Sequence, residues 1–188
     1  IQREMLLALI NKVETMPIDD GSYTHVGFYT KASAAELLAA LESAKTAYES
    51  GSGYGAAYEM LYAEKEKFVN SPNLSFVPFD PSLTYVITNC AYSDKTMHLN
   101  SGLKSATGVD QTANTARWQF KTDTEGVYKL YNTAGYYLTA PAKSTTVGST
   151  ATVDDAAKFT LLQESPVGAW SISLSPAAEY TTLHDNSY

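Results

Sequence analysis

The chain of 188 residues carries 13 Lys and Arg against 20 Asp and Glu, giving a formal net charge of −7, and it contains one cysteine. Nucleic-acid binding usually needs a basic face, so this charge balance argues against a nucleic-acid partner. Cys90 alone excludes an internal disulfide and a cysteine-based zinc site. No apolar stretch reaches the roughly 20 residues that span a bilayer, and a hydrophobic share of 44% indicates a folded protein.

Apolar residues recur at helical spacing in the first part of the chain. The first stripe ends before a proline and consists of Met5, Leu6, Leu9, Ile10, Val13 and Met16. A second helix is predicted to begin at Ser33, because Glu36 three residues later completes a capping box. Gly51 is the expected end of this helix, since glycine readily adopts the left-handed backbone that closes a helix.

A third helical stretch runs from about Tyr54 to Phe68 after a short turn at residues 49–53. A turn this short makes the last two helices antiparallel neighbours, so residues 1–74 are predicted to form an antiparallel three-helix bundle. The segments LLALINKVE, AAELLAALESAKTAYESG and YGAAYEMLYAEKEKF resemble the FIVAR-type three-helix modules of secreted bacterial glycosidases. This resemblance implies an accessory or spacer role beside glycan-related domains.

From residue 75 onward, short alternating runs separated by Gly, Asn, Asp and Ser indicate β-structure. The hairpin GVYKLYNTAGYYLTAP at residues 126–141 is one of three similar segments. Its first arm starts at Tyr128 and has counterparts at Tyr85 and Trp170; its second arm, at 136–139, has counterparts at 97–100 and 181–184. The strand at Trp118 has counterparts at Phe159 and Phe76, again about 42 residues away. These markers predict an internal threefold repeat.

Three units of about 42 residues predict an all-β trefoil over residues 75–188, because one unit cannot bury its aromatic residue alone. The predicted fold class is therefore α+β in two segments, a helical bundle followed by a trefoil. The sequence accounts for eleven of twelve trefoil strands, and the last strand is expected to be missing or cropped after Leu183. A β-sandwich with an accidental repeat is the alternative fold.

The hairpins YVITNCAYSDKTMHLN, YKLYNTAGYYLT and WSISLSPAAEYTTLH resemble those of the ricin-type β-trefoil lectins. In that family an Asp after the hairpin's Leu accepts hydrogen bonds from two sugar hydroxyls, and an aromatic ring packs against the sugar. The equivalent positions here are Asn100, Thr139 and His184, none of which is a carboxylate. The family's Q-x-W glutamine falls on Ala116 and Ala157.

The resemblance implies a non-catalytic, lectin-like carbohydrate-binding accessory module of a secreted or surface bacterial protein, in an extracellular, periplasmic or cell-surface location. The predicted sugar-binding residues are Asn100, Tyr92, Tyr137, Thr139, His184 and Asp185. A glycan or polysaccharide is the expected partner, with no cofactor, metal or membrane span. No nucleophile, phosphate-binding or zinc-protease motif occurs, so no catalysis is expected. The alternative is a protein-interaction or structural module whose trefoil has lost sugar binding.

Overall fold

The computed structural model describes residues 1–140, 145–164, 167–176 and 183. The protein is mixed α+β, with three helices and antiparallel β-sheets over these ranges. It divides into two compact units: one spans Ile1–Phe79 with a short return around Gly168, and the other holds the rest of the chain from Asp80. Within the described ranges, no helix combines the length and the apolar composition needed to cross a bilayer.

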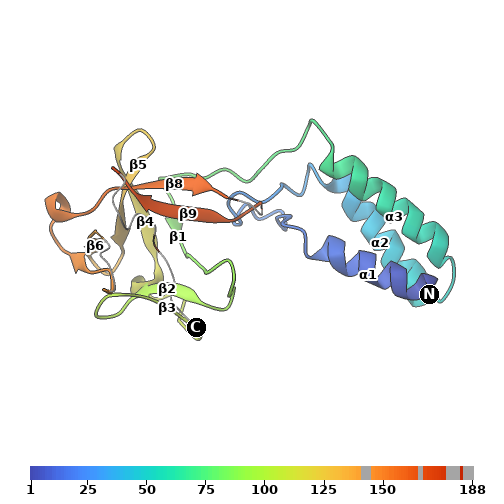
Figure 1. The fold of residues 1–188 in the computed structure, drawn as a ribbon, viewed down its shortest axis with the longest axis horizontal. Helices are drawn as coiled ribbons and strands as arrows, with labels where there is room; N and C mark the ends of the chain where they lie inside the picture. Colours follow the sequence, from blue (N-terminus) through green and yellow to red (C-terminus); the bar gives the residue numbers. More distant parts are fainter. Residues whose placement is uncertain (141–144, 165–166, 177–182, 184–188) are drawn as a thin grey trace. The chain divides into compact units, whose positions relative to one another are not determined.

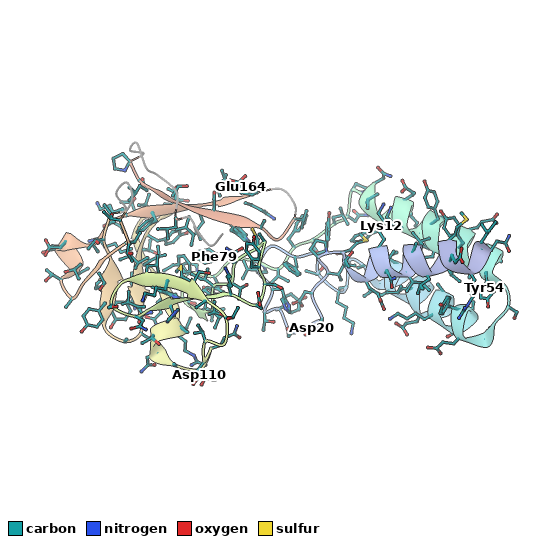
Figure 2. The ribbon with its side chains drawn as sticks, turned by 60° about the horizontal axis from the view of Figure 1, so that its bottom comes forward. Lys12, Asp20, Tyr54, Phe79, Asp110 and Glu164 are labelled. Carbon is teal, nitrogen blue, oxygen red and sulfur yellow. The ribbon has the colours of Figure 1, made fainter. Side chains whose placement is uncertain are left out.

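The first unit contains the three predicted helices, which are confirmed as α1 (Gln2–Glu14), α2 (Ala35–Ser50) and α3 (Tyr54–Val69). The helices lie side by side, with Tyr54 at the turn between α2 and α3 (Figures 1 and 2). They share one apolar core, which includes Leu6, Leu9, Ile10, Val13, Leu37, Leu41, Ala44, Leu61 and Phe68. Leu6, Leu9, Ile10 and Val13 come from the predicted first stripe, because helical spacing of three and four gathers them on one face.

The predicted capping box at the start of α2 is wrong. The helix begins at Ala35, and no side chain caps its amino end. Ser33 instead donates its hydroxyl to the Thr30 carbonyl at 3.0 Å, and the Glu36 carboxylate pairs with the Lys67 ammonium. The reason is that residues 31–34 already form a turn, which places Ser33 inside that turn rather than at the helix boundary. Gly51, in contrast, ends α2 with a left-handed φ of 81°, as predicted.

The second unit is built from short antiparallel strands. In chain order they are β1 (Thr84–Tyr85), β2 (Thr96–Leu99), β3 (Leu103–Ala106), β4 (Trp118–Thr124), β5 (Val127–Asn132), β6 (Tyr136–Leu138), β7 (Ser149–Thr150), β8 (Phe159–Gln163) and β9 (Trp170–Leu174). Over the described residues, one sheet follows the path β1-β4-β5-β6-β7, with β8 joining β5 to β9, and β2 pairs with β3 separately (Figure 1). Two 3₁₀ turns, η1 (Asn114–Ala116) and η2 (Val153–Asp155), precede β4 and β8.

The interior of this unit is filled by one face of these strands. Trp118, Leu130, Leu138 and Phe159 have no solvent exposure, which follows from the alternation of side chains along a strand. The Trp118 indole N–H is satisfied by the Met97 carbonyl at 3.0 Å. Buried polar groups need such partners, since an unmet one costs about 1–3 kcal/mol.

One predicted repeat marker lies outside the β-unit, and another lies almost entirely outside the described residues. Phe76, the expected first-copy counterpart of Trp118, lies in the first unit, forms a β-bridge with Tyr29 and is 42% exposed. Because Phe76 pairs with the segment between α1 and α2, it is not the aromatic core residue of a repeat in the β-unit. The third hairpin's return arm lies outside the described residues except at Leu183, whose N–H donates to the Ile172 carbonyl at 2.9 Å. The trefoil itself stays a prediction.

Candidate functional site

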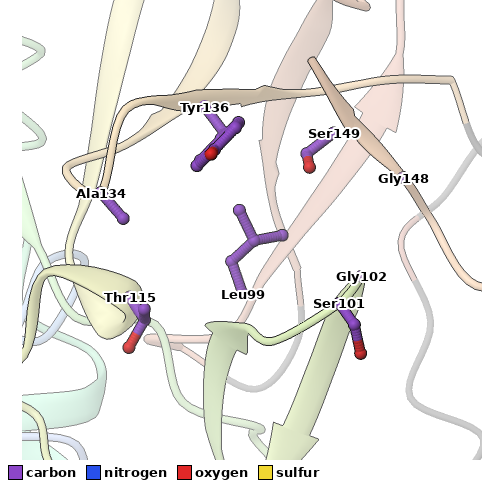
Figure 3. A pocket seen from close by; sticks show the side chains of 8 residues that line it. All are labelled: Leu99, Ser101, Gly102, Thr115, Ala134, Tyr136, Gly148 and Ser149. Carbon is purple, nitrogen blue, oxygen red and sulfur yellow. The ribbon is translucent and has the colours of Figure 1, made fainter. Parts of the chain in front are cut away.

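A pocket of about 340 Å³ opens in the β-unit, where several turns meet. Its lining residues come from the end of β2, the β2–β3 turn, η1, the β5–β6 turn, β6 and the start of β7 with the residue before it. They are Leu99, Ser101, Gly102, Thr115, Ala134, Tyr136, Gly148 and Ser149 (Figure 3). This volume lies within the range of about 300–1,000 Å³ that is usual for small-molecule sites.

The pocket presents one aromatic ring. Tyr136 is 45% exposed, and its side chain and that of Leu99 project into the opening from opposite sides (Figure 3). The Ser149 hydroxyl is directed toward the same space, whereas the hydroxyls of Ser101 and Thr115 stand at the rim and turn away from it. Rotation about χ1 is available to both rim residues, because serine and threonine each have several staggered rotamers. None of the lining residues that the structure describes is charged.

The β2–β3 turn that borders the pocket has an uncommon backbone. Ser101 has a φ of 50° and Gly102 a φ of 136°, and the Asn100 N–H donates to the Gly102 carbonyl at 2.9 Å. A left-handed φ is uncommon for a residue other than glycine. A Cβ at position 102 would lie 2.7 Å from the Thr146 Cγ2, so this site requires glycine. Strained backbone of this kind is concentrated at functional sites.

Of the residues predicted for sugar binding, Asn100, Tyr137 and Thr139 lie next to this pocket in the chain, but none of these three lines it. Asn100 is exposed between two lining residues. Tyr137 points to the other face of β6 from Tyr136 and packs against Tyr131, with ring centroids 4.8 Å apart. Thr139 is half-buried and donates its N–H to the Gly148 carbonyl at 3.0 Å. His184 and Asp185 lie outside the described residues.

Tyr92 belongs to a separate loop before β2. Its ring is half-exposed, and the Lys95 ammonium lies 4.7 Å from the ring centroid. The Asn89 side-chain oxygen accepts hydrogen bonds from the N–H groups of Ala91 and Tyr92, which fixes the turn. The structure therefore does not bring Tyr92 to the pocket lining.

A second group of functional side chains lies in the first unit, in the loop between α1 and α2. Asp19 is buried there, and its two carboxylate oxygens accept hydrogen bonds from the N–H groups of Gly21, Tyr23 and His25 and from the His25 ring Nδ1. Burial alone would raise the pKa of this carboxyl, but the hydrogen bonds outweigh it and lower the pKa from 3.8 to about 2. Asp19 therefore stays ionised in the folded protein at neutral pH.

This loop is also the place where metal-ligating groups come together among the described residues. Ligand atoms of Asp19, Asp20 and His25 lie within 4.8 Å of one another, in the loop marked by Asp20 in Figure 2. Both oxygens of Asp19 are already engaged by N–H donors, which a cation would have to displace. The arrangement fits a carboxylate that organises a loop better than a metal centre.

The loop around Asp19 presents Tyr23 in a left-handed conformation, with a φ of 60° and a ring that is 59% exposed. Beside it lies a mostly apolar pocket of about 470 Å³, lined by Gly21, Tyr23, Lys31, Ala32, Ala35 and Leu38. Sequence reasoning missed this feature. The signal present was the turn-rich run Asp19-Asp20-Gly21-Ser22, and it does not indicate which neighbouring residue adopts the left-handed backbone.

The chain matches no protein-family model and no curated protein.

Proposed function

We propose that the chain is a non-catalytic carbohydrate-binding module and that the pocket beneath Tyr136 is its sugar site. A tyrosine ring offers a sugar an apolar surface together with a polar hydroxyl. Leu99 extends the apolar surface, and the Ser149 hydroxyl can orient a ligand. The observation that carries the proposal is the exposed Tyr136 ring at a pocket of ligand size, because a ligand can remove that apolar surface from water.

The uncharged lining favours a neutral sugar. The sugar-binding carboxylate of the ricin-type lectins has no counterpart among the described lining residues, so the hydrogen bonds that these residues form with a ligand would all be neutral. Neutral hydrogen bonds are roughly half as strong as charge-assisted ones. We therefore expect weak binding, with a dissociation constant on the order of 1 mM.

We further propose that the β-unit is a trefoil and that the three helices form an antiparallel bundle. Strand pairing supports the trefoil: Tyr85 pairs with Trp118, and Tyr128, 43 residues after Tyr85, pairs with Phe159, 41 residues after Trp118. In each pair the second strand of one copy meets the first strand of the next. The 3₁₀ turns before β4 and β8 follow the same repeat. The proposed secreted or surface location rests on the lectin and FIVAR resemblances.

The alternative function is that of a protein-interaction module. The pocket beside Tyr23 favours it, because that pocket is mostly apolar and lies next to an exposed ring in the helical unit. Large apolar surfaces on a folded protein often mark protein interfaces.

The test is a glycan array of the whole chain, followed by isothermal titration calorimetry with the neutral sugars that bind. Tyr136→Ala should abolish binding, whereas Tyr62→Ala should not, because Tyr62 on α3 has a similar exposure outside the pocket. Loss of binding in Tyr92→Ala but not in Tyr136→Ala would contradict the assigned site. A blank array at high protein concentration would refute sugar binding and favour the protein-interaction alternative.

A further inference from the structure

The outer face of β4, β5 and β6 carries a cluster that the pocket does not use. Strand register places Gln119, Lys121, Lys129, Tyr131 and Tyr137 on this face, which we call the lysine–tyrosine face. The alternate residues of the same strands, including Trp118 and Leu130, are buried on the inner face. Tyr136 pairs with Asn132 and belongs to the inner side, so the lysine–tyrosine face is separate from the Tyr136 pocket.

Two like charges meet on this face. Lys121 and Lys129 are directly opposite each other in the antiparallel β4–β5 ladder. Like charges in directly opposed positions destabilise a sheet, so this pairing is unfavourable unless an anion relieves it. Neither ammonium forms an ion pair with a carboxylate of the described residues. The Lys129 Nζ donates to the Val153 carbonyl at 2.8 Å, and the Lys121 Nζ lies 5.4 Å from the Tyr131 ring centroid.

The acidic residue on β4 is already paired with another lysine. Asp123 follows Lys121 by two residues on β4, but its carboxylate pairs with the Lys158 ammonium at 3.0 Å. The two lysines therefore form a local positive spot on a chain whose net charge is −7. Such a positive site favours ligands whose anionic groups reach the two lysines without contacting much of the acidic surface of the rest of the protein.

Aromatic surface adjoins the charges. Tyr131 is two residues from Lys129 on β5, a distance of about 7 Å along the strand. Tyr131 and Tyr137 pack at a centroid separation of 4.8 Å with their planes inclined by 54°, and both remain partly exposed. Cationic groups beside aromatic rings suit a ligand that carries both anionic groups and apolar ring faces.

We infer that the lysine–tyrosine face binds an acidic polysaccharide, with carboxylates of a polyuronate placed on Lys121 and Lys129 and a sugar ring against Tyr131 and Tyr137. A polyuronate fits this face because it carries one charge per sugar, whereas a densely sulfated chain would be repelled more strongly by the acidic protein. The inference does not depend on the Tyr136 pocket, which is assigned to neutral sugars.

Affinity electrophoresis of the whole chain in gels containing polygalacturonate tests this inference. The protein should be retarded by polygalacturonate but not by the methyl-esterified polymer, which has the same rings without the charges. The double variant Lys121→Gln/Lys129→Gln should lose the retardation, and Tyr137→Ala should reduce it. Lys104→Gln is the matched control, because Lys104 is an exposed lysine on β3 of the same unit.

Thermal unfolding separates binding from stability. Relief of the opposed charges should leave the Tm of the double variant unchanged or raise it. The inference is overturned if the wild type is not retarded, if the esterified polymer retards it equally, or if Lys104→Gln and the double variant behave alike. A lower Tm in the double variant would also overturn it, because the lysines would then stabilise the fold instead of serving a ligand.

Discussion

The replacement Asp19→Asn tests the role of the buried carboxylate in the α1–α2 loop. Asn keeps the shape of the side chain but removes the charge, and its NH₂ group cannot accept the N–H donors that now surround both carboxylate oxygens. The pKa of Asp19 is lowered from 3.8 to about 2. At 1.36 kcal/mol for each pKa unit, the folded state favours the ionised form by about 2 kcal/mol.

Removing the charge should destabilise the helical unit by a similar amount at pH 7. For a unit of this size, 1 kcal/mol corresponds to about 4–8 °C in Tm, so the expected decrease is about 8–16 °C. Circular dichroism at 222 nm is the appropriate assay, because all α-helices of the described residues belong to this unit. Asp20→Asn is the control: its exposed carboxylate accepts hydrogen bonds from Ser22 alone, and the decrease in Tm should be smaller.

The pH dependence gives a second readout of the same carboxylate. A group with a lowered pKa contributes stability that is fully present above the unfolded pKa and lost as the pH falls through the folded pKa. The Asp19 contribution should therefore disappear between about pH 4 and pH 2, and Asp19→Asn should lack this part of the transition. A Tm for Asp19→Asn within about 3 °C of the wild type, together with an unchanged acid transition, would refute this reasoning.

Two further predictions concern the β-unit. Asn132→Ala should destabilise this unit by about 1–3 kcal/mol, because the buried amide donates to the Thr115 carbonyl at 2.8 Å; calorimetric unfolding measures the change. Gly102→Ala should lower stability by about 1–3 kcal/mol through its left-handed φ and its close contact with Thr146, and should weaken neutral-sugar binding in the same titrations as Tyr136→Ala. An unchanged Tm in either variant would contradict the corresponding contact.

Local patterns were sufficient to predict the helices. The apolar stripes and Gly51 placed α1, α2 and α3 within a few residues of their observed bounds, because the spacing of apolar residues reflects burial on one helix face. The turn between β5 and β6 is also predicted from residues adjacent in the chain. The hairpin segment around Gly135 is observed, with Asn132 paired to Tyr136. These features depend on neighbours in the chain, so the sequence alone contains the relevant information.

The features that were missed depend on partners distant in sequence. Ser33 has the residue type of a helix cap, yet its hydroxyl lies 3.4 Å from the carbonyl of Ser75, 42 residues away. Phe76 has the spacing of a repeat marker, but it forms an isolated β-bridge with Tyr29. The Tyr136 pocket likewise takes its lining from the segments around residues 99–102, 115, 134–136 and 148–149. Spacing within one segment cannot specify such an assembly.

The two pockets differ in charge and in residue type, but they share a strained backbone position. Among the described residues, Tyr23 and Ser101 are the non-glycine residues with positive φ, and each of them lines one of the two pockets. Such a conformation costs of order 1–3 kcal/mol and persists where the surroundings impose it. At Tyr23, the Asp19 carboxylate stabilises the strained conformation, since it accepts the Tyr23 N–H at 2.9 Å. If Asp19→Asn releases Tyr23 from this conformation, the helical unit keeps its core but changes the shape of its apolar pocket. If the protein-interaction alternative holds, Asp19→Asn should therefore weaken binding of a protein partner at the apolar pocket. Sugar binding at Tyr136 should be unaffected by this replacement.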